Sequence, residues 1–208
     1  MSRYTGSVCK LCRREREKLF LKGERCVSKC TLERKRGKNL PGQHGAGKGK
    51  ASDYARHLRE KQKAKRVYGL TEQQFKHYFK RAEKVRKGLT GDTLLKLLEL
   101  RLDNVVYRLG FFPSRKLARQ MVNHGLISVN GRRINLPGYQ VKAGDKINIK
   151  DKLKDNPIVK KCLEAGDKCP SWLSVEKEKL AGSIITMPGL GEFSHPINSQ
   201  LIVELYSK

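Results

Sequence analysis

The stretch from Ser114 to Asn135 constrains the fold more than any other part of this 208-residue chain. Ser114 is a favourable N-cap, and the residues after it have high helix propensity. Gly125 stands where a left-handed C-cap belongs, and Asn130-Gly131 is the strongest short-range signal for a β-hairpin. The sequence therefore predicts a helix followed directly by a hairpin. The apolar stripe of this helix consists of Leu117, Ala118, Met121 and Val122.

Polar side chains lie on the other side of this helix and at the tip of the hairpin. The cations of the helix are not balanced by acids four residues away, as the charges of a solvated face usually are. Because two elements that present cations suit a rigid run of phosphates, we predict RNA binding here; an ordinary helix–hairpin with solvated charges is the alternative. Since Arg115 and Arg119 lie off the apolar stripe, replacing both is expected to spare the fold. The predicted RNA-binding residues are Ser114, Arg115, Lys116, Arg119, Gln120, Asn130, Gly131, Arg132 and Arg133.

The charge of the chain also indicates a polyanionic partner. The formal net charge is +26 and the sequence pI is about 10.1, far more than solubility requires. Residues 1–90 contain 27 Lys and Arg against 8 Asp and Glu, whereas residues 170–208 contain 3 against 4. The first half of the chain is therefore suited to nucleic acid, and the last segment is suited to protein contact or to packing.

The chain has no apolar run of membrane-spanning length, and its polar, basic start lacks the apolar core of a secretory signal. We therefore expect a cytoplasmic protein without a membrane partner. Its six cysteines should then be reduced thiols or metal ligands rather than disulfides.

Four of the cysteines form two close pairs, Cys9-x2-Cys12 and Cys26-x3-Cys30. Two such pairs can complete a tetrahedral site, so we predict one zinc ion that supplies folding energy to this charged segment. An iron–sulfur cluster would accept the same four thiolates, and four unconnected thiols are the simpler alternative. Cys162 and Cys169 have no partner pairs and are expected to be structural.

The first 90 residues contain further candidates for RNA contact. A Gly-rich stretch at residues 39–50 is not a P-loop, because Gly49 follows Lys48 where Ser or Thr is required; His44 in this stretch is interpreted as loop polarity or a phosphate contact. Ser52 can cap a helix that runs to about Tyr68. The predicted contacts are Arg13, Arg14, Lys22 and Arg25 near the cysteines, Lys48 and Lys50 in the loop, and Arg56, Arg59, Lys61, Lys63 and Arg66 in the helix.

The remaining elements follow from periodicity and turn signals. Thr71 and Gln74 form a capping box for a helix whose aromatic stripe is more typical of a core than of base stacking. Asp92 is expected to cap a single helix that runs to Leu109. Residues 139–141 and 146–149 alternate like strands, residues 157–165 suit a short helix, and residues 201–206 resemble a buried strand.

Several segments together resemble the bacterial small-subunit ribosomal protein S4 family. They read CRRE, KLFLKGERC, ERKR, LPGQHGA, SDYARHLREKQKAKRVYGLTEQQF and RLDNVVYRLGF, and the likeness extends over essentially the whole chain. The helix–hairpin resembles the S4 (alpha-L) RNA-binding module of that family, with matches at Ser114, Arg115, Arg119, Gly131 and Arg132. Metal-bearing relatives have four residues between the third and fourth cysteines, where this chain has three. The resemblance also implies that Arg101 faces RNA; a local ion pair is the alternative.

The resemblance implies an α+β fold: an N-terminal metal finger and helical domain, with an inserted S4 module of helices packed on a small antiparallel sheet. We expect a basic four-cysteine metal-binding finger and Gly-rich loop at residues 1–45 and a helical rRNA-binding domain at 46–91. The S4 module should occupy residues 92–169, and residues 170–208 should return to the helical domain.

The function implied by this family is that of a structural constituent of the small ribosomal subunit. Such a protein is a primary binder of 16S rRNA that nucleates subunit assembly. It contacts ribosomal protein S5, contributes to translational accuracy, helps to line the mRNA entrance with ribosomal protein S3, and in some relatives represses its own operon.

An RNA-modifying enzyme is the alternative, because pseudouridine synthases and a tRNA synthetase also carry S4 modules. Those enzymes need a catalytic domain, and this sequence offers neither paired carboxylates in a credible cleft nor a nucleophile–base pair. We therefore expect no enzymatic activity and no small-molecule substrate.

Overall fold

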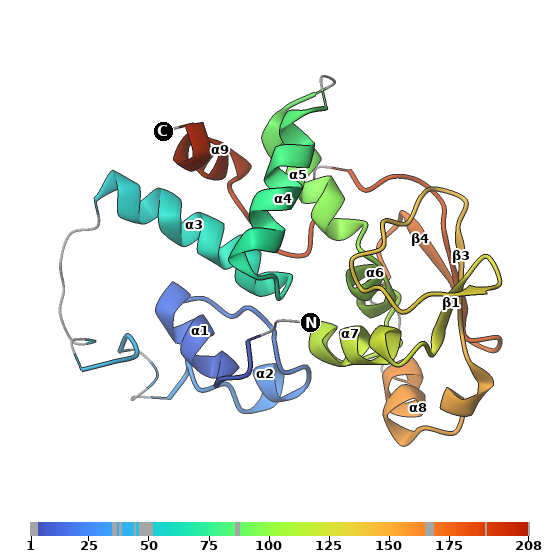
Figure 1. Cartoon of the computed structure of the whole chain (residues 1–208). Helices are drawn as coiled ribbons and strands as arrows, with labels where there is room; N and C mark the ends of the chain where they lie inside the picture. The colour runs from blue at the N-terminus through green and yellow to red at the C-terminus, as the bar shows by residue number, and fades with distance from the viewer. Residues whose placement is uncertain are drawn as a thin grey trace. The chain divides into compact units, whose positions relative to one another are not determined.

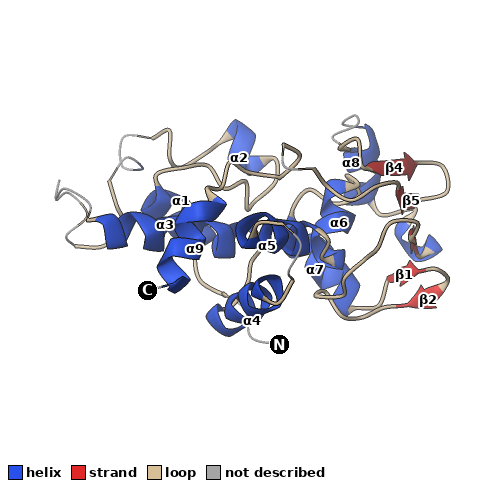
Figure 2. Ribbon diagram, turned by 90° about the horizontal axis from the view of Figure 1, so that it is seen from above, coloured by secondary structure: helices blue, strands red, loops and turns tan. Residues whose placement is uncertain are grey.

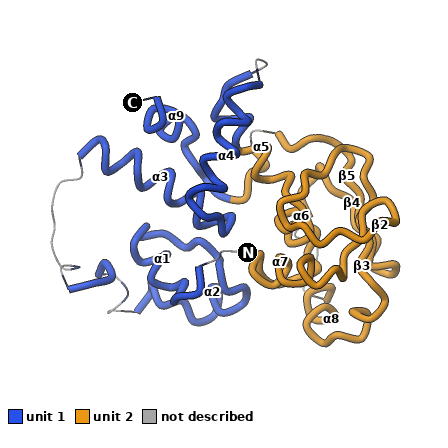
Figure 3. The backbone as a smooth tube through the Cα atoms, in the orientation of Figure 1, with its two compact units in different colours: residues 1–94, 195–208 blue, residues 95–194 orange. Residues whose placement is uncertain are grey.

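The computed structural model describes residues 4–34, 37, 39–43, 45, 52–85, 88–164, 169–189 and 191–207. The chain divides into two compact units, residues 1–94 with 195–208 (unit 1) and residues 95–194 (unit 2), which Figure 3 colours separately. No helix within the described ranges combines the length and apolarity needed to cross a bilayer.

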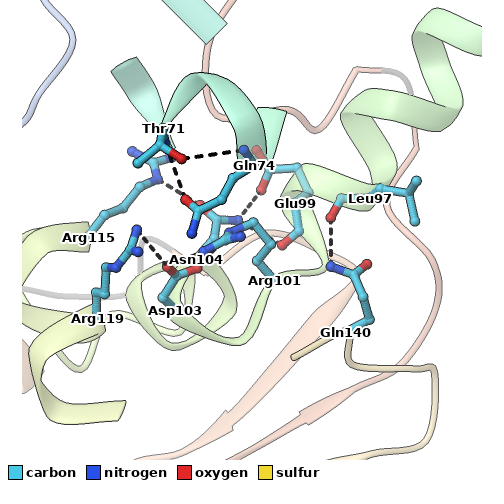
Figure 4. Close-up of polar contacts among 10 residues, drawn as sticks. All are labelled: Thr71, Gln74, Leu97, Glu99, Arg101, Asp103, Asn104, Arg115, Arg119 and Gln140. Atoms are coloured by element: carbon cyan, nitrogen blue, oxygen red, sulfur yellow. Dashed lines mark hydrogen bonds and ion pairs between the residues drawn. The ribbon is translucent and has the colours of Figure 1, made fainter. Parts of the chain in front are cut away.

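Unit 1 is helical. Its helices are α1 (Val8–Glu15), α2 (Arg25–Ser28), α3 (Asp53–Val67), α4 (Glu72–Glu83) and α9 (Ser199–Ser207), together with the start of α5 (Thr90–Glu99). Two predicted N-caps are confirmed. The Ser52 side chain accepts a hydrogen bond from the Ala55 amide at the start of α3. Thr71 and Gln74 form the complete capping box of α4, as Figure 4 shows.

The core of unit 1 joins α4 to α9. The aromatic stripe of α4, including Phe75 and Phe79, is buried as predicted. Tyr206 of α9 stacks on Phe79 with ring centroids 4.3 Å apart. Helix α9 also packs against α3 (Figure 1), and Ile202 is completely buried. The strand predicted at residues 201–206 is therefore wrong, because this apolar run gains its burial as a helix on neighbouring helices.

Unit 2 contains the end of α5 and a sheet covered by helices. Its helices are α6 (Leu102–Arg108), α7 (Arg115–Asn123) and α8 (Pro157–Glu164), with a 3₁₀ turn at Asp151–Leu153. Its strands are β1 (Ile127–Val129), β2 (Arg132–Arg133), β3 (Lys146–Ile149), β4 (Leu173–Glu176) and β5 (Ala181–Ile184). Within the described residues they form one antiparallel sheet in the order β2-β1-β3-β5-β4, and Figure 2 draws its strands in red with helices beside them.

Helices α6 and α7 bury their apolar faces together with the inner face of the sheet. Val105 of α6, Val122 of α7, Ile127 of β1 and Ile147 of β3 are all completely buried in one cluster. Leu109, just after α6, packs closely on β5 at Gly182, where an added Cβ would lie 2.6 Å from Leu109 Cδ2. This mixed α+β architecture confirms the predicted class, with an antiparallel sheet larger than the sequence patterns alone indicated.

Two elements differ from the sequence-based prediction. The single helix expected from Asp92 to Leu109 is instead two helices, because Arg101 has an extended backbone (φ −69°, ψ 135°) and forms a β-bridge with Gln140. The strand expected at residues 139–141 is reduced to that bridge. Strands β4 and β5 were not predicted.

Candidate nucleic-acid interface

Helix α7 begins as the sequence predicts and divides its residues between core and solvent. The Ser114 hydroxyl accepts a hydrogen bond of 3.4 Å from the Leu117 amide. Ala118 and Val122 are buried against the sheet, whereas Lys116 and Gln120, one turn apart, are exposed. Because the apolar stripe of α7 packs on the core, the rotation of the helix is fixed and Lys116 and Gln120 are exposed to solvent.

The hairpin tip is held in its conformation by a second turn. Asn130 (φ 50°) and Gly131 (φ 79°) both have left-handed backbones, as a two-residue hairpin turn requires. The Asn130 side chain donates to Asp145 Oδ1 at 2.8 Å and accepts from the Lys146 amide at 2.9 Å. Its amide therefore anchors the tip, while Arg132 remains exposed.

Arg133 connects the hairpin to the end of α7. Its Nη2 donates to the His124 carbonyl at 3.1 Å, which satisfies an orphan carbonyl of the helix C-terminus. Its guanidinium lies over Gly125, where an added Cβ would be 2.0 Å from Arg133 Nε. Gly125 has φ +65°, so the predicted left-handed C-cap is confirmed. Helix and hairpin are thus fixed to each other by a side chain as well as by the chain itself.

A buried polar network lies beneath α7, at the start of α6 (Figure 4). Arg101, only 3% exposed, donates two hydrogen bonds of 3.0 and 2.7 Å to the Asp103 carboxylate. Arg119 Nη1 lies 4.0 Å from Asp103 Oδ2. Asp103 therefore draws a cation of α7 toward the interior of unit 2.

Asn104 likewise holds Arg115 toward the interior of unit 2. Arg115 Nε donates to Asn104 Oδ1 at 2.7 Å, and Asn104 Nδ2 donates to Glu99 Oε2 at 2.6 Å. The Arg115 guanidinium also stands 4.5 Å from the centroid of the Tyr107 ring. The local ion pair that was the alternative for Arg101 is present, with Asp103 as its partner. Glu99 and Asn104 were not predicted; the polar residues Asp103 and Asn104 inside the otherwise apolar run from Leu102 to Val106 were the available signal.

The predicted RNA-binding cations of α3 are engaged inside unit 1. Arg66 and Arg59 pair with the nearly buried Glu15 carboxylate of α1. Lys63 Nζ lies 2.8 Å from Glu17, and Lys61 lies 2.5 Å from Glu72 of α4. Arg56 pairs with Asp53 at the exposed start of the helix. The pairs with Glu15, Glu17 and Glu72 connect α3 to the end of α1, to the residue two positions after it, and to α4.

Burial changes the chemistry of Glu15. Desolvation raises the pKa of its carboxyl group, and the attraction of Arg66 and Arg59 does not fully offset that effect. Removal of either guanidinium group would leave this nearly buried carboxylate with still less compensation for its lost hydration.

The other predicted cations of residues 1–45 differ in their surroundings. Arg13 Nη2 donates to the Asn39 carbonyl at 2.9 Å and so braces the following loop. Arg14, Lys22 and Arg25 are exposed, and within the described ranges their side chains form no ion pair. Three further candidates, His44, Lys48 and Lys50, lie outside the described residues.

The predicted metal site is wrong. Within the described residues, which include Cys9, Cys12, Cys26 and Cys30, no three His, Cys, Asp or Glu side chains form a group that could hold a metal ion. Burial raises the pKa of the Cys12 thiol above its ordinary value. The N-terminal segment is held instead by the ion pairs of Glu15 and Glu17 with α3 and by the completely buried Leu19. Neither zinc nor an iron–sulfur cluster is supported, and the described part of the N-terminal segment is not a metal finger.

Comparison with known proteins gives one consistent result. Residues 3–99 match the family described as "Ribosomal protein S4/S9 N-terminal domain", and residues 100–147 match the "S4 domain". A protein of Endomicrobium trichonymphae named small ribosomal subunit protein uS4 is 66% identical over 209 residues, covering 100% of both chains. Proteins of the same name from Solidesulfovibrio magneticus and Pelotomaculum thermopropionicum are 53% and 51% identical over 211 residues, again covering 100% of both chains.

Proposed function

The chain belongs to the ribosomal protein S4 family and is a structural, non-enzymatic constituent of the small ribosomal subunit, and from this premise we propose that it binds 16S rRNA through α7 and the β1–β2 hairpin. We define the α7–hairpin surface as the exposed residues of these elements among those predicted to bind RNA. It comprises Lys116, Gln120, Asn130, Gly131, Arg132 and Arg133.

The observation that supports this proposal is that some of the basic residues are held by internal partners whereas others are exposed and form no ion pair. Arg101, Arg115 and Arg119 are held by Asp103 and Asn104. Lys116 and Arg132 are exposed, and no ion pair engages them within the described residues. Buried polar contacts thus fix the helix, and the free cations are available for phosphates. Since phosphate contacts supply most of the affinity for structured RNA, the surface recognises shape rather than base sequence.

A binding titration against 16S rRNA tests this proposal. The double variant Lys116→Ala with Arg132→Ala is expected to weaken binding and to make the salt dependence shallower by about one unit of slope for each phosphate interaction removed. The matched control is Lys150→Ala with Lys152→Ala, which removes two exposed lysines outside the α7–hairpin surface. Equal losses in the two variants, or no loss in the first, would contradict the assignment.

Three finer roles rest on family resemblance. The first is primary binding of 16S rRNA that nucleates subunit assembly, and the net charge of +26 supports it, because such a chain associates rapidly with RNA before other proteins have bound. Order-of-addition reconstitution tests this role: the chain should bind naked 16S rRNA and should be needed for later proteins to join.

The second role is contact with ribosomal proteins S5 and S3, with consequences for accuracy and for the mRNA entrance. The near-neutral C-terminal segment supports this role, because residues 170–208 contain 3 Lys and Arg against 4 Asp and Glu and so attract phosphate poorly. Cross-linking in assembled subunits tests it.

The third role is translational repression of its own operon, which would use the same RNA-binding surface. Binding to the leader of its own messenger, lost in Lys116→Ala with Arg132→Ala, is the expected result.

A further inference from the structure

Helix α4 has a basic face in addition to its buried aromatic stripe. The cations Lys76, Lys80, Arg81 and Lys84, together with His77, are all exposed. At 3.6 residues per turn these five positions fall within an arc of about 140°, centred opposite the arc that contains the buried positions. The buried positions are Phe75, Tyr78, Phe79 and Ala82. Because the core fixes the rotation of α4 about its axis, the whole basic face is directed toward solvent.

The cations of this face are free of internal partners. Within the described part of the chain, none of their side chains forms an ion pair or a hydrogen bond. Helix α4 contains two acids, Glu72 and Glu83. Glu72 accepts hydrogen bonds from Lys61 at 2.5 Å and from Lys65 at 2.8 Å, whereas Glu83 forms no ion pair within the described residues. Glu72 therefore neutralises lysines of α3 rather than those of α4.

The two helices make a direct comparison. Arg56, Arg59, Lys61, Lys63, Lys65 and Arg66 of α3 all pair with carboxylates of unit 1. On α4 and its C-cap residue Lys84, by contrast, Lys76, Lys80 and Lys84 follow one another at i, i+4 and i+8, so that like charges face each other along about 12 Å of helix. That repulsion costs stability in the free protein and is relieved when a polyanion binds.

We infer that the basic face of α4 is a second RNA-contact surface, which takes the phosphate backbone of 16S rRNA without reading bases. This inference rests on the proposed function and shifts the RNA contact of unit 1 from α3 to α4. Charge complementarity selects the partner: a row of lysines without fixed acceptors suits a run of phosphates, each contact releasing counterions. Both acids of α4, Glu72 and Glu83, lie outside the basic arc, so the charge that this face presents to an RNA backbone is net positive.

The test is a salt-dependent titration of the full chain against 16S rRNA. Neutralising the row in the triple variant Lys76→Gln, Lys80→Gln, Lys84→Gln preserves helix propensity, since Gln and Lys are nearly equal helix formers. The plot of log affinity against log salt should become shallower by about 2 to 3 units, since each phosphate interaction that is removed accounts for about 0.7 to 0.9. The triple Lys→Arg variant keeps the charge and should retain the wild-type slope.

A matched control separates a local contact from a general loss of charge. The variant Lys150→Gln, Lys152→Gln, Lys179→Gln removes three exposed lysines of unit 2 and should change the slope by less than about 1 unit. Equal slope changes in both triple variants, or an unchanged slope in the α4 variant, would overturn the inference. If circular dichroism shows that the triple variant has lost helix, the single variant Lys80→Gln replaces it in the test. Its salt slope should become shallower by about 1 unit, and an unchanged slope would overturn the inference.

Failure of the inference is distinguishable from failure of the proposed function. Suppose that wild-type protein binds 16S rRNA and that only the Lys116→Ala, Arg132→Ala variant has a shallower salt dependence. The α7–hairpin surface is then supported as an RNA contact, and the α4 surface is rejected. If wild-type protein does not bind 16S rRNA, the proposed function itself falls.

Discussion

Arg115 donates a 2.7 Å hydrogen bond from Nε to Oδ1 of Asn104, a side chain only 1% exposed. This contact fixes the first turn of α7 to the first turn of α6, and the other end of the Asn104 amide is bound to the Glu99 backbone and carboxylate. Arg115, one of the residues predicted to bind RNA, therefore also stabilises the packing of α7 on α6 in unit 2. If a substitution at Arg115 weakens RNA binding, the loss can come from a missing RNA contact or from destabilisation of unit 2. Measuring the stability of the variant separates these two causes.

Arg115→Ala is expected to destabilise unit 2 by about 1.5–3 kcal/mol, the usual range for a hydrogen bond that involves a charged group. This revises the expectation that Arg115 and Arg119 can be replaced without effect on the fold. Urea unfolding of the full chain measures the change, and Lys116→Ala, one residue along and exposed, should stay within about 0.5 kcal/mol of wild type. A double-mutant cycle with Asn104→Ala should show that the two losses are not additive; additive losses would mean that the pair is not coupled.

The features predicted correctly from sequence are those determined by a few neighbouring residues. Ser52, Thr71 with Gln74, Ser114 and the Asn130-Gly131 turn act on backbone groups within four residues, so the sequence alone contains the relevant chemistry.

The features that were missed depend on distant partners. Strand β5 (Ala181–Ile184) has little strand propensity of its own and forms because β3 and β4 pair with it on both sides. The partners of Arg59 and Arg66 are 44 and 51 residues away, at Glu15. A cation count along α3 could not reveal that these charges are neutralised internally.

Acid should weaken unit 1 through Glu72. Burial raises the pKa of this carboxyl group, but hydrogen bonds from Lys61 and Lys65 lower it more, so the net pKa is below the ordinary value of 4.5. Because the folded pKa is depressed, the stabilisation is complete above about pH 4.5 and is lost as the pH falls through the folded pKa.

The thermal midpoint of Glu72→Gln should therefore fall less than that of wild type between about pH 5 and pH 3. Glu83→Gln, at the other end of α4 and without an ion pair in the described residues, serves as the control and should follow wild type. Parallel pH profiles for wild type and Glu72→Gln would exclude this pairing as a source of acid sensitivity.

Tyr206 should be the main side chain that holds α9 in unit 1. Its ring stacks on Phe79 at 4.3 Å and lies 6.5 Å from the ring of Phe75. Tyr206→Ala is expected to cost about 2 kcal/mol, less than a fully buried aromatic residue because this ring is only partly buried. Tyr206→Phe keeps the stacking and should stay within about 1 kcal/mol of wild type. Denaturant unfolding checks both values, and equal losses would assign the stability to the hydroxyl group instead.

Gly125 should tolerate a side chain less well than Gly144, although both have positive φ. Gly144 (φ +87°) has open space where a Cβ would be added, so Gly144→Ala measures backbone strain alone, about 1–2 kcal/mol. At Gly125 (φ +65°) the new methyl group would also displace the Arg133 guanidinium from the end of α7. Gly125→Ala should therefore be the less stable of the two and should also bind 16S rRNA more weakly, whereas equal stabilities and affinities would remove Arg133 from its linking role.

The last prediction concerns the near-neutral segment and its proposed contact with ribosomal protein S5. Glu178 lies in the turn between β4 and β5; it is exposed, and no ion pair engages it in the described residues. Glu176, at the end of β4, pairs with Lys179 at 3.1 Å, so Glu178 is the acid of this turn that is free to meet a partner.

Glu178→Lys is therefore expected to leave the affinity for 16S rRNA within about twofold, since a single exposed charge far from the phosphate contacts has little effect at physiological salt. At the proposed contact, a lysine at position 178 would repel a cation of the partner that Glu178 attracts. The same change should therefore alter the error rate of translation in cells whose ribosomes carry the variant. Misincorporation reporters and rRNA titrations measure the two quantities separately, with Lys177→Glu, the opposite reversal in the same turn, as the control for loop damage. Normal accuracy combined with altered RNA affinity would show that this turn faces RNA rather than a protein.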